Sequence, residues 1–171
     1  GGLALAANPP VGISTSTGDM HGELAQDKAP KTVANFLSYV ADKHYDGTIF
    51  HRVIGNFMIQ GGDPIGSGMG GPGYQFRQEI HPDLRHSGPG ILAMANSGPN
   101  TNGSQFYITI ESQASLDGAY NVLGKVVEGQ KAVDQTLKGD KIHYVLIHRV
   151  GEAAQNFDAL DTFNQLKDAN N

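Results

Sequence analysis

Two segments of the chain combine large apolar side chains with polar ones, and these segments could carry chemistry. They span residues 50–63 and 88–107. The sequence contains no cysteine, which excludes thiol nucleophiles, disulfides, iron–sulfur clusters and cysteine zinc sites. Any catalysis must therefore come from other groups.

The first of these segments places an arginine near an apolar pair. Arg52 lies on one face of an expected strand, and a turn at residues 55–56 presents Phe57 and Met58 next to Gln60. Taken alone, this pattern favours Phe57 and Met58 as core residues and Arg52 as a surface charge. A functional interpretation needs the second segment as well.

Several other kinds of active site are excluded by spacing. His81/His86 and His143/His148 are each five residues apart, which puts each pair on opposite faces of a strand, and no H-E-x-x-H motif occurs. No metal site is therefore expected. A G-x-S-x-G nucleophile motif is absent, and the glycine-rich run 66–71 is followed by proline rather than by the Lys-Ser/Thr of a phosphate-binding loop.

Length and charge narrow the class of protein further. The 171 residues suit one domain, and a net charge of −5 without a basic cluster gives nucleic acids little to bind. No apolar run approaches the roughly 18 residues that a membrane helix needs. We therefore expect neither a nucleic acid nor a membrane as a partner.

The elements that must position the two segments are mainly strands. Period-2 alternation and bounding turn residues predict strands at residues 11–17, 48–54, 58–61, 91–95, 105–110, 122–127 and 141–150. Helices are predicted at residues 30–42, 129–138 and 152–168. So many strands favour closure into a barrel, because closure removes unpaired strand edges.

The two chemical segments together resemble the cyclophilin family of peptidyl-prolyl isomerases. Residues 50–63 read F-H-R-V-I-G-N-F-M-I-Q-G-G-D, and residues 88–107 read G-P-G-I-L-A-M-A-N-S-G-P-N-T-N-G-S-Q-F-Y. Further matches, D-K-A-P-K-T-V-A-N-F from residue 27 and L-D-G from residue 116, extend the resemblance over roughly 11–150. The glycine-rich loop and the residues that follow position 149 look more like bacterial members.

This resemblance implies a mainly β fold, a closed eight-stranded antiparallel barrel capped by two helices, with the active site outside the barrel. It implies isomerisation of X–Pro bonds in client proteins, without cofactor or metal. Carried over position by position, it makes Arg52 the catalytic residue. The implied substrate-binding residues are Phe57, Met58, Gln60, Ala95, Asn96, Gln105, Tyr107, Leu116 and Tyr120.

An arginine suits this reaction for a physical reason. Rotation about an X–Pro bond crosses a barrier of about 18–20 kcal/mol because it destroys amide resonance, and the twisted state gains a nitrogen lone pair. A guanidinium can donate to that lone pair more strongly in the twisted state than in either planar one, which is the condition for catalysis. No covalent intermediate is required.

The chain also departs from the family pattern. Many members have a tryptophan where this chain has Ser115, so the resemblance implies weak cyclosporin binding with isomerase activity retained. Tyr107 replaces the commoner phenylalanine and is expected to add a hydroxyl at the pocket rim, while Tyr120 stands where a histidine often lies. His51 and His86 match family positions, and we interpret both as structural.

Three further expectations concern the two ends of the sequence and an alternative function. Residues 1–10 are expected to be a flexible terminus, with an A-x-A pattern at 4–6 that resembles a signal-peptide remnant and suggests the periplasm, the cytoplasm being the alternative. Residues 11–150 would form the isomerase domain and 151–171 a helical extension of a monomer. A non-catalytic proline-peptide binding or chaperone module is the alternative function, which the presence of Arg52 disfavours.

Overall fold

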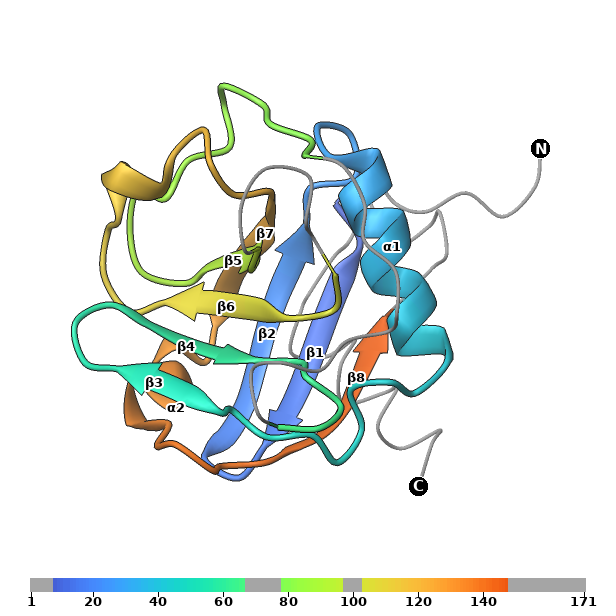
Figure 1. Ribbon diagram of the computed structural model, residues 1–171, viewed down its shortest axis with the longest axis vertical. Helices are drawn as coiled ribbons and strands as arrows, with labels where there is room; N and C mark the ends of the chain where they lie inside the picture. The colour runs from blue at the N-terminus through green and yellow to red at the C-terminus, as the bar shows by residue number, and fades with distance from the viewer. Residues whose placement is uncertain (1–7, 67–77, 97–102, 148–171) are drawn as a thin grey trace.

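Eight antiparallel strands form one strongly curled sheet in the computed structural model, which describes residues 8–66, 78–96 and 103–147 (Figure 1). The strands are β1 Pro10–Thr15, β2 Gly18–Leu24, β3 Arg52–Ile54, β4 Met58–Gly61, β5 Ile91–Met94, β6 Phe106–Thr109, β7 Val122–Glu128 and β8 Ile142–Ile147. Their order across the sheet is β3-β4-β6-β5-β7-β2-β1-β8. The predicted mainly β fold with eight antiparallel strands is confirmed.

The two ends of this sheet approach each other just before β3 and β8. The Phe50 N–H donates to the Asp140 carbonyl at 2.8 Å, and the Ile142 N–H donates to the Thr48 carbonyl at 2.8 Å. Residues 48–50 therefore pair with the chain before β8 and not with β4. For this reason the predicted strand 48–54 is wrong in its first half, and β3 itself has three residues.

Strand β2 is absent from the sequence-based prediction because its residues, GDMHGEL, are too polar to alternate clearly. In the sheet it lies between β1 and β7, so Met20 and His21 are buried despite the weak pattern. Tertiary pairing determines this strand more than its own composition does.

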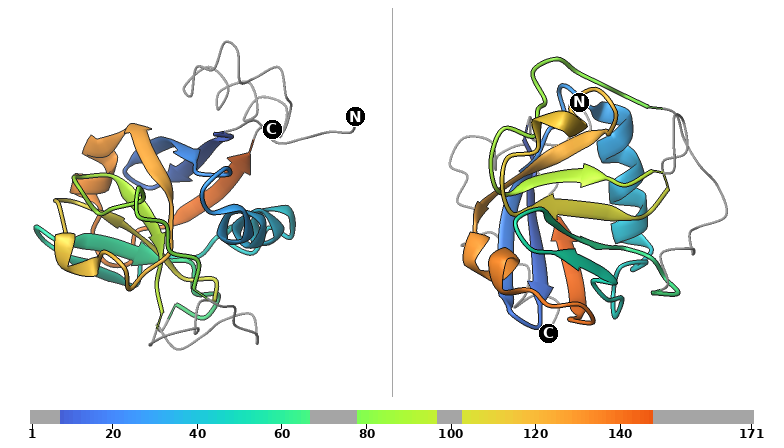
Figure 2. Two further views of the ribbon diagram at one scale, coloured as in Figure 1. Left: turned by 90° about the horizontal axis from the view of Figure 1, so that it is seen from above. Right: turned by 60° about the vertical axis from the view of Figure 1, so that its left-hand side comes forward.

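The two helices of the described residues lie on opposite sides of the curled sheet (Figures 1 and 2). Helix α1, Pro30–Ala41, confirms the helix predicted at 30–42; it packs against β7 and β8 and buries Val33, Phe36 and Leu37. Helix α2, Gln130–Gln135, packs against β2 and is shorter than the predicted 129–138, because Thr136 already has extended backbone angles.

Parts of the prediction lie outside the described residues, namely the N-terminal residues 1–7, most of the glycine-rich run, the end of the last strand and the helix at 152–168. Within the described ranges, no helix is both long and apolar enough to cross a membrane.

Alternation along the strands divides apolar side chains between two sets. On β5, Leu92 and Met94 enter the main core, whereas Ala93 points to the other face of the sheet. On β6, Phe106 enters the core while Tyr107 lies on the outer face. The period of two along a strand thus builds an interior core and, behind it, a second apolar cluster outside the sheet.

Helix α1 has no capping side chain of its own and is capped by a distant glutamate. Ala29 is the N-cap residue, and the following N–H groups need acceptors. The Glu79 carboxylate accepts from the Lys31 N–H at 3.1 Å, from the Thr32 N–H at 2.8 Å and from the Thr32 hydroxyl at 2.8 Å. Its charge also lies at the positive end of the helix dipole.

We expect Glu79→Gln to lower the free energy of unfolding by about 1–2 kcal/mol, because a cap and a favourable charge are both weakened. Urea unfolding of the variant and of Glu128→Gln, an exposed carboxylate at the end of β7, provides the comparison. Equal stability of the two variants would show that Glu79 does not stabilise the helix.

Candidate active site

The outer apolar cluster contains the residues predicted for the proline pocket. Its buried members lie on β4, β5, β6 and β7, and half-buried residues from the start of β5 and from the surrounding loops pack against them. The buried members are Met58, Ala93, Tyr107 and Val122, and the half-buried ones are Phe57, Leu84, Ile91, Ala95, Leu116 and Tyr120. All six predicted apolar and aromatic site residues are in this set.

A tight turn between β3 and β4 presents the first two of these residues. Asn56 has a φ of 62°, a left-handed conformation that asparagine tolerates better than most residues. The Phe57 N–H donates to the Ile54 carbonyl at 3.1 Å, which closes the turn. Phe57 is left half-buried at the edge of the cluster, and Met58 is buried within it.

One row of register partners connects the arginine to the pocket. Arg52 faces Gln60 across β3 and β4, Gln60 faces Tyr107 on β6, and Tyr107 faces Ala93 on β5. Ala93 in turn faces Val122 on β7. Cross-strand partners on one face lie about 5 Å apart, so the guanidinium is anchored within two strands of the aromatic wall.

The arginine is exposed and held only loosely. Its Nη1 lies 3.5 Å from Gln60 Oε1, which is at the long limit of a hydrogen bond. The Gln60 amide in turn donates from Nε2 to Gln105 Oε1 at 3.0 Å. Among the described residues only Gln60 bonds to the guanidinium, so most of its donors are available there to a ligand at the edge of the cluster.

The predicted backbone-holding residues lie along the same edge. The Ala95 N–H donates to the Gln105 carbonyl at 2.9 Å. Asn96 Nδ2 donates to the Ala119 carbonyl at 3.0 Å, next to Tyr120. Six of the ten predicted site residues therefore lie in the outer cluster, and the guanidinium of Arg52 and three amide side chains lie beside it.

The hydroxyl of Tyr107 does not lie at the pocket rim, so that part of the prediction is wrong. It is 2.6 Å from His86 Nε2, and the side chain of Tyr107 is only 4% exposed. The hydroxyl points away from solvent because its buried hydrogen bond to the imidazole would be costly to lose. Only the ring of Tyr107 is left to face a ligand.

The electrostatics of these groups have clear causes. Burial raises the pKa of Tyr107, so its hydroxyl keeps its proton at neutral pH. The hydrogen bond from the His86 N–H lowers the pKa of Asp117, and a second bond from the His86 ring acts in the same direction. Asp117 is therefore a carboxylate at neutral pH.

The lowered pKa of Asp117 predicts a pH-dependent contribution to stability. Its folded-state pKa lies below the unfolded value, so the contribution is present above about pH 4 and is lost as the pH falls through the folded-state pKa. Asp117→Asn should therefore be less stable than the unmodified protein at pH 7, and the difference should narrow in acid. Urea unfolding over a pH series measures it, and a difference independent of pH would contradict the assignment.

The sequence did not indicate His86 or Asp117 as part of the site. Asp117 appeared only within the L-D-G match, and no spacing rule joins it to a histidine 31 residues earlier. Val122 could have been found, because its neighbour Leu123 is fully buried in the core and alternation then places Val122 on the outer face.

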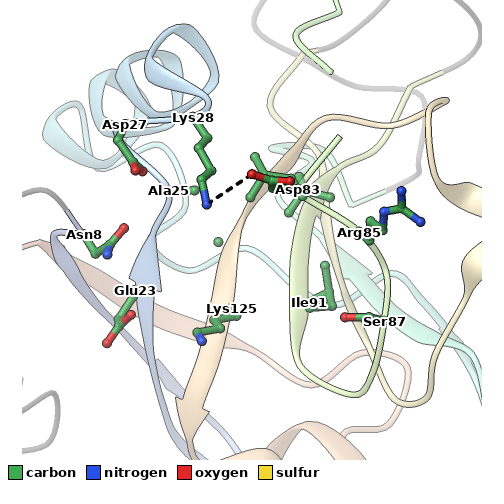
Figure 3. Close-up of a pocket in the computed structure, with 13 residues that line it drawn as sticks. Asn8, Glu23, Ala25, Asp27, Lys28, Asp83, Arg85, Ser87, Ile91 and Lys125 are labelled. Atoms are coloured by element: carbon green, nitrogen blue, oxygen red, sulfur yellow. Dashed lines mark ion pairs between the residues drawn. The ribbon is translucent and has the colours of Figure 1, made fainter. Parts of the chain in front are cut away.

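A hollow of about 340 Å³ lies over β2 and β7 (Figure 3); its lining includes Leu84, Ile91 and Val122 of the outer cluster but none of the ten predicted site residues. Lys28 and Asp83 form an ion pair of 3.9 Å across its rim. The charges around it are balanced, with Glu23, Asp27 and Asp83 against Lys28, Arg85 and Lys125. Within the described ranges, no group of three or more histidine or carboxylate side chains could hold a metal.

Comparison with known families decides what this surface belongs to. The family model of cyclophilin type peptidyl-prolyl cis-trans isomerase/CLD matches residues 11–165. This chain is a cyclophilin. It is accordingly a peptidyl-prolyl cis-trans isomerase, of class EC 5.2.1.8.

Relatives of the cyclophilin come from several kingdoms. It is 50% identical over 139 residues to peptidyl-prolyl cis-trans isomerase CYP18-1 of Arabidopsis thaliana, covering 77% of this chain and 87% of that one. It is 47% identical over 139 residues to peptidyl-prolyl cis-trans isomerase B of Streptomyces anulatus, covering 71% of this chain and 79% of that one.

A solved structure resembles the cyclophilin in fold as well as in sequence. The cyclophilin type isomerase of Cryptosporidium parvum has a TM-score of 0.78 and 39% identity, with 82% of this chain and 98% of that chain covered. A second structure of that protein, in the presence of the dipeptide Ala-Pro, has a TM-score of 0.77.

Proposed function

We propose that the outer cluster binds the proline ring of an X–Pro segment and that Arg52 stabilises the twisted peptide bond. The observation that carries this is the register row, in which Arg52, Gln60 and Tyr107 follow one another on one face of the sheet. Phe57, Met58 and the ring of Tyr107 then form an apolar cradle. The exposed guanidinium lies at its edge, where it can donate to the prolyl nitrogen.

The other site residues would hold the substrate backbone. Gln60 and Gln105 are already joined by a hydrogen bond of 3.0 Å, and Asn96 is fixed to the Ala119 carbonyl. Side chains that are held in place before binding lose less entropy when they bind an extended peptide. The substrate would thus be fixed on both sides of the rotating bond, and no covalent step is needed.

The test is to measure the cis-to-trans rate and the affinity of an X–Pro peptide with the same protein preparation. Acceleration of the cis-to-trans exchange, together with saturable binding of the peptide, supports the proposed enzyme mechanism. Binding without acceleration would instead support the alternative, a non-catalytic proline-peptide binding or chaperone module. A peptide with alanine in place of proline is the matched control for binding through the apolar cradle.

We further propose proline-containing segments of unfolded client proteins as substrates, so that the protein assists folding. The dipeptide Ala-Pro present with the Cryptosporidium parvum relative supports a proline-containing ligand. Cis–trans isomerisation of X–Pro bonds is slow enough to limit folding, so such clients would gain from catalysis. Refolding of a protein with a proline-limited slow phase would test this step.

Several finer proposals concern the whole chain. Residues 11–150 would be the isomerase domain, and residues 151–171 would be a helical extension of it. Within the domain, the curled eight-stranded sheet would close into a barrel. We propose a monomer of bacterial kinship, which the glycine-rich loop and the residues after position 149 support, and a periplasmic location, which the A-x-A pattern supports. Sedimentation tests the monomer, and fractionation of the native host tests the location.

Weak inhibition by cyclosporin is expected, because Ser115 provides no indole donor where many cyclophilins have tryptophan. Ser115 is exposed on the short helix η1, Ala114–Leu116, so Ser115→Trp should fold and should tighten inhibition at least about tenfold if one charge-free hydrogen bond and ring contact are gained. Inhibition of the unmodified protein at low nanomolar concentration would contradict the expectation.

A further inference from the structure

Behind the proposed pocket, three side chains form a continuous hydrogen-bonded chain. The Tyr107 hydroxyl lies 2.6 Å from His86 Nε2, and His86 Nδ1 lies 2.8 Å from Asp117 Oδ1. The same carboxylate oxygen accepts from the His86 backbone N–H at 2.7 Å. His86 is fully buried and its bond to the Tyr107 hydroxyl lies in the interior, whereas the Asp117 carboxylate is partly exposed.

In the hydrogen-bonded path from Asp117 to Tyr107, the ionised carboxylate and a neutral imidazole determine which atom donates and which accepts at each step. An ionised Asp117 can only accept, so His86 Nδ1 must carry a proton. In the neutral ring this leaves Nε2 as an acceptor, and the Tyr107 hydroxyl must donate to it. The carboxylate therefore fixes the tautomer of the imidazole, and the tautomer fixes the direction of the tyrosine hydroxyl.

His86 also connects the separate elements that surround the pocket. Its carbonyl accepts from the Gln113 N–H at 2.9 Å and from the Ser112 hydroxyl at 3.1 Å, just before helix η1. Its ring stacks on Tyr107 with centroids 5.8 Å apart and an interplanar angle of 14°. Tyr107 in turn meets Tyr120 edge-on at 5.8 Å.

We propose that His86 and Asp117 are positioning residues that hold the ring of Tyr107 as the wall of the proline pocket. This rests on the proposed function, because it assumes that the proline ring packs on Tyr107. Neither residue has to touch the substrate, and both act through the tyrosine hydroxyl. The effect should therefore appear in peptide affinity, whereas the turnover of bound peptide depends on Arg52.

A double-mutant cycle tests this route. Asp117→Asn removes the charge that fixes the tautomer, and Tyr107→Phe removes the hydroxyl but keeps the ring. We expect each single change to raise KM for an X–Pro peptide about fivefold, with kcat changed less than about twofold. The double variant should have the same KM as either single variant, because both changes interrupt the same hydrogen-bonded path from Asp117 through His86 to Tyr107.

The controls separate this proposal from its alternatives. Asp83→Asn makes the same chemical change at an exposed carboxylate of the neighbouring loop and should leave KM unchanged. If the effects of Asp117→Asn and Tyr107→Phe multiply, Asp117 acts by loosening the local fold and the proposal is overturned. If the unmodified protein neither binds nor isomerises the peptide, it is the proposed function that fails instead.

The protonation of the two ring nitrogens of His86 can be measured directly, and it tests the proposed order of donors independently of the stability of the fold. In nitrogen-15 spectra of the neutral ring, Nδ1 should appear protonated and Nε2 unprotonated, and Asp117→Asn should shift the tautomer balance. A neutral ring protonated at Nε2 in the unmodified protein would contradict the proposed order of donors and so overturn the proposal.

Discussion

Replacing Arg52 with alanine is expected to remove most of the isomerisation rate while peptide affinity changes little. The guanidinium is exposed and only loosely bonded to Gln60, so its loss should not disturb the fold. Its donors match a lone pair that exists only in the twisted state, so the loss should fall on kcat. Losing one such preorganised donor costs about 10²–10³ in rate.

Arg52→Lys is the matched variant, because it keeps the charge and loses the planar fork. A lysine that restored the full rate would show that charge alone suffices, contrary to the geometric role given to the guanidinium. Rates and affinities of both variants should be measured with one peptide at saturating and limiting concentrations. An alanine variant that keeps its kcat and loses affinity would make Arg52 a binding residue.

The second large effect concerns stability, through a glycine on β7, the strand that contributes Val122 to the outer cluster. Gly124 pairs with Leu24 across β7 and β2, and a Cβ at Gly124 would collide with the backbone carbonyl of Glu23. Since backbone atoms in the middle of a sheet cannot move aside, Gly124→Ala should cost about 3 kcal/mol or more. Val122, two residues earlier in the outer cluster, would be displaced with it.

Thermal unfolding measures this effect, with an expected fall in midpoint of about 10 °C for a chain of this size. Gly55→Ala is the control, because a Cβ there meets nothing within 4 Å and its backbone is not in the left-handed region. Equal midpoints for the two variants would show that β2 and β7 can separate locally without cost.

Many of the strands and helices could be predicted from the sequence, because strand alternation and helical periodicity depend only on the order of neighbouring residues. Val33, Phe36 and Leu37 recur at helical spacing within the predicted helix and are buried. Strand β2 could not be found in this way, because its burial comes from the strands on either side. The first half of the predicted strand 48–54 failed for a similar reason, since residues 48–50 take partners from residues 139–142.

The site was accessible through the resemblance and not through spacing. From spacing alone, Phe57 and Met58 favoured the core, and the sheet instead places Met58 on its outer face next to Tyr107. The direction of the Tyr107 hydroxyl could not be predicted, because it depends on His86 and on a carboxylate 31 residues further along the chain. Such contacts depend on how loops cross the sheet, which no local pattern encodes.

The proposed proline site can be located by the intermolecular nuclear Overhauser contacts between a bound X–Pro peptide and the protein. We expect the proline ring protons to contact the Met58 methyl and the Leu116 methyls, because these surround the ring of Tyr107 in the outer cluster. Contacts from the proline ring to Ala25, in the charged hollow over β2 and β7, would place the ligand there and would contradict binding of the proline ring at the outer cluster.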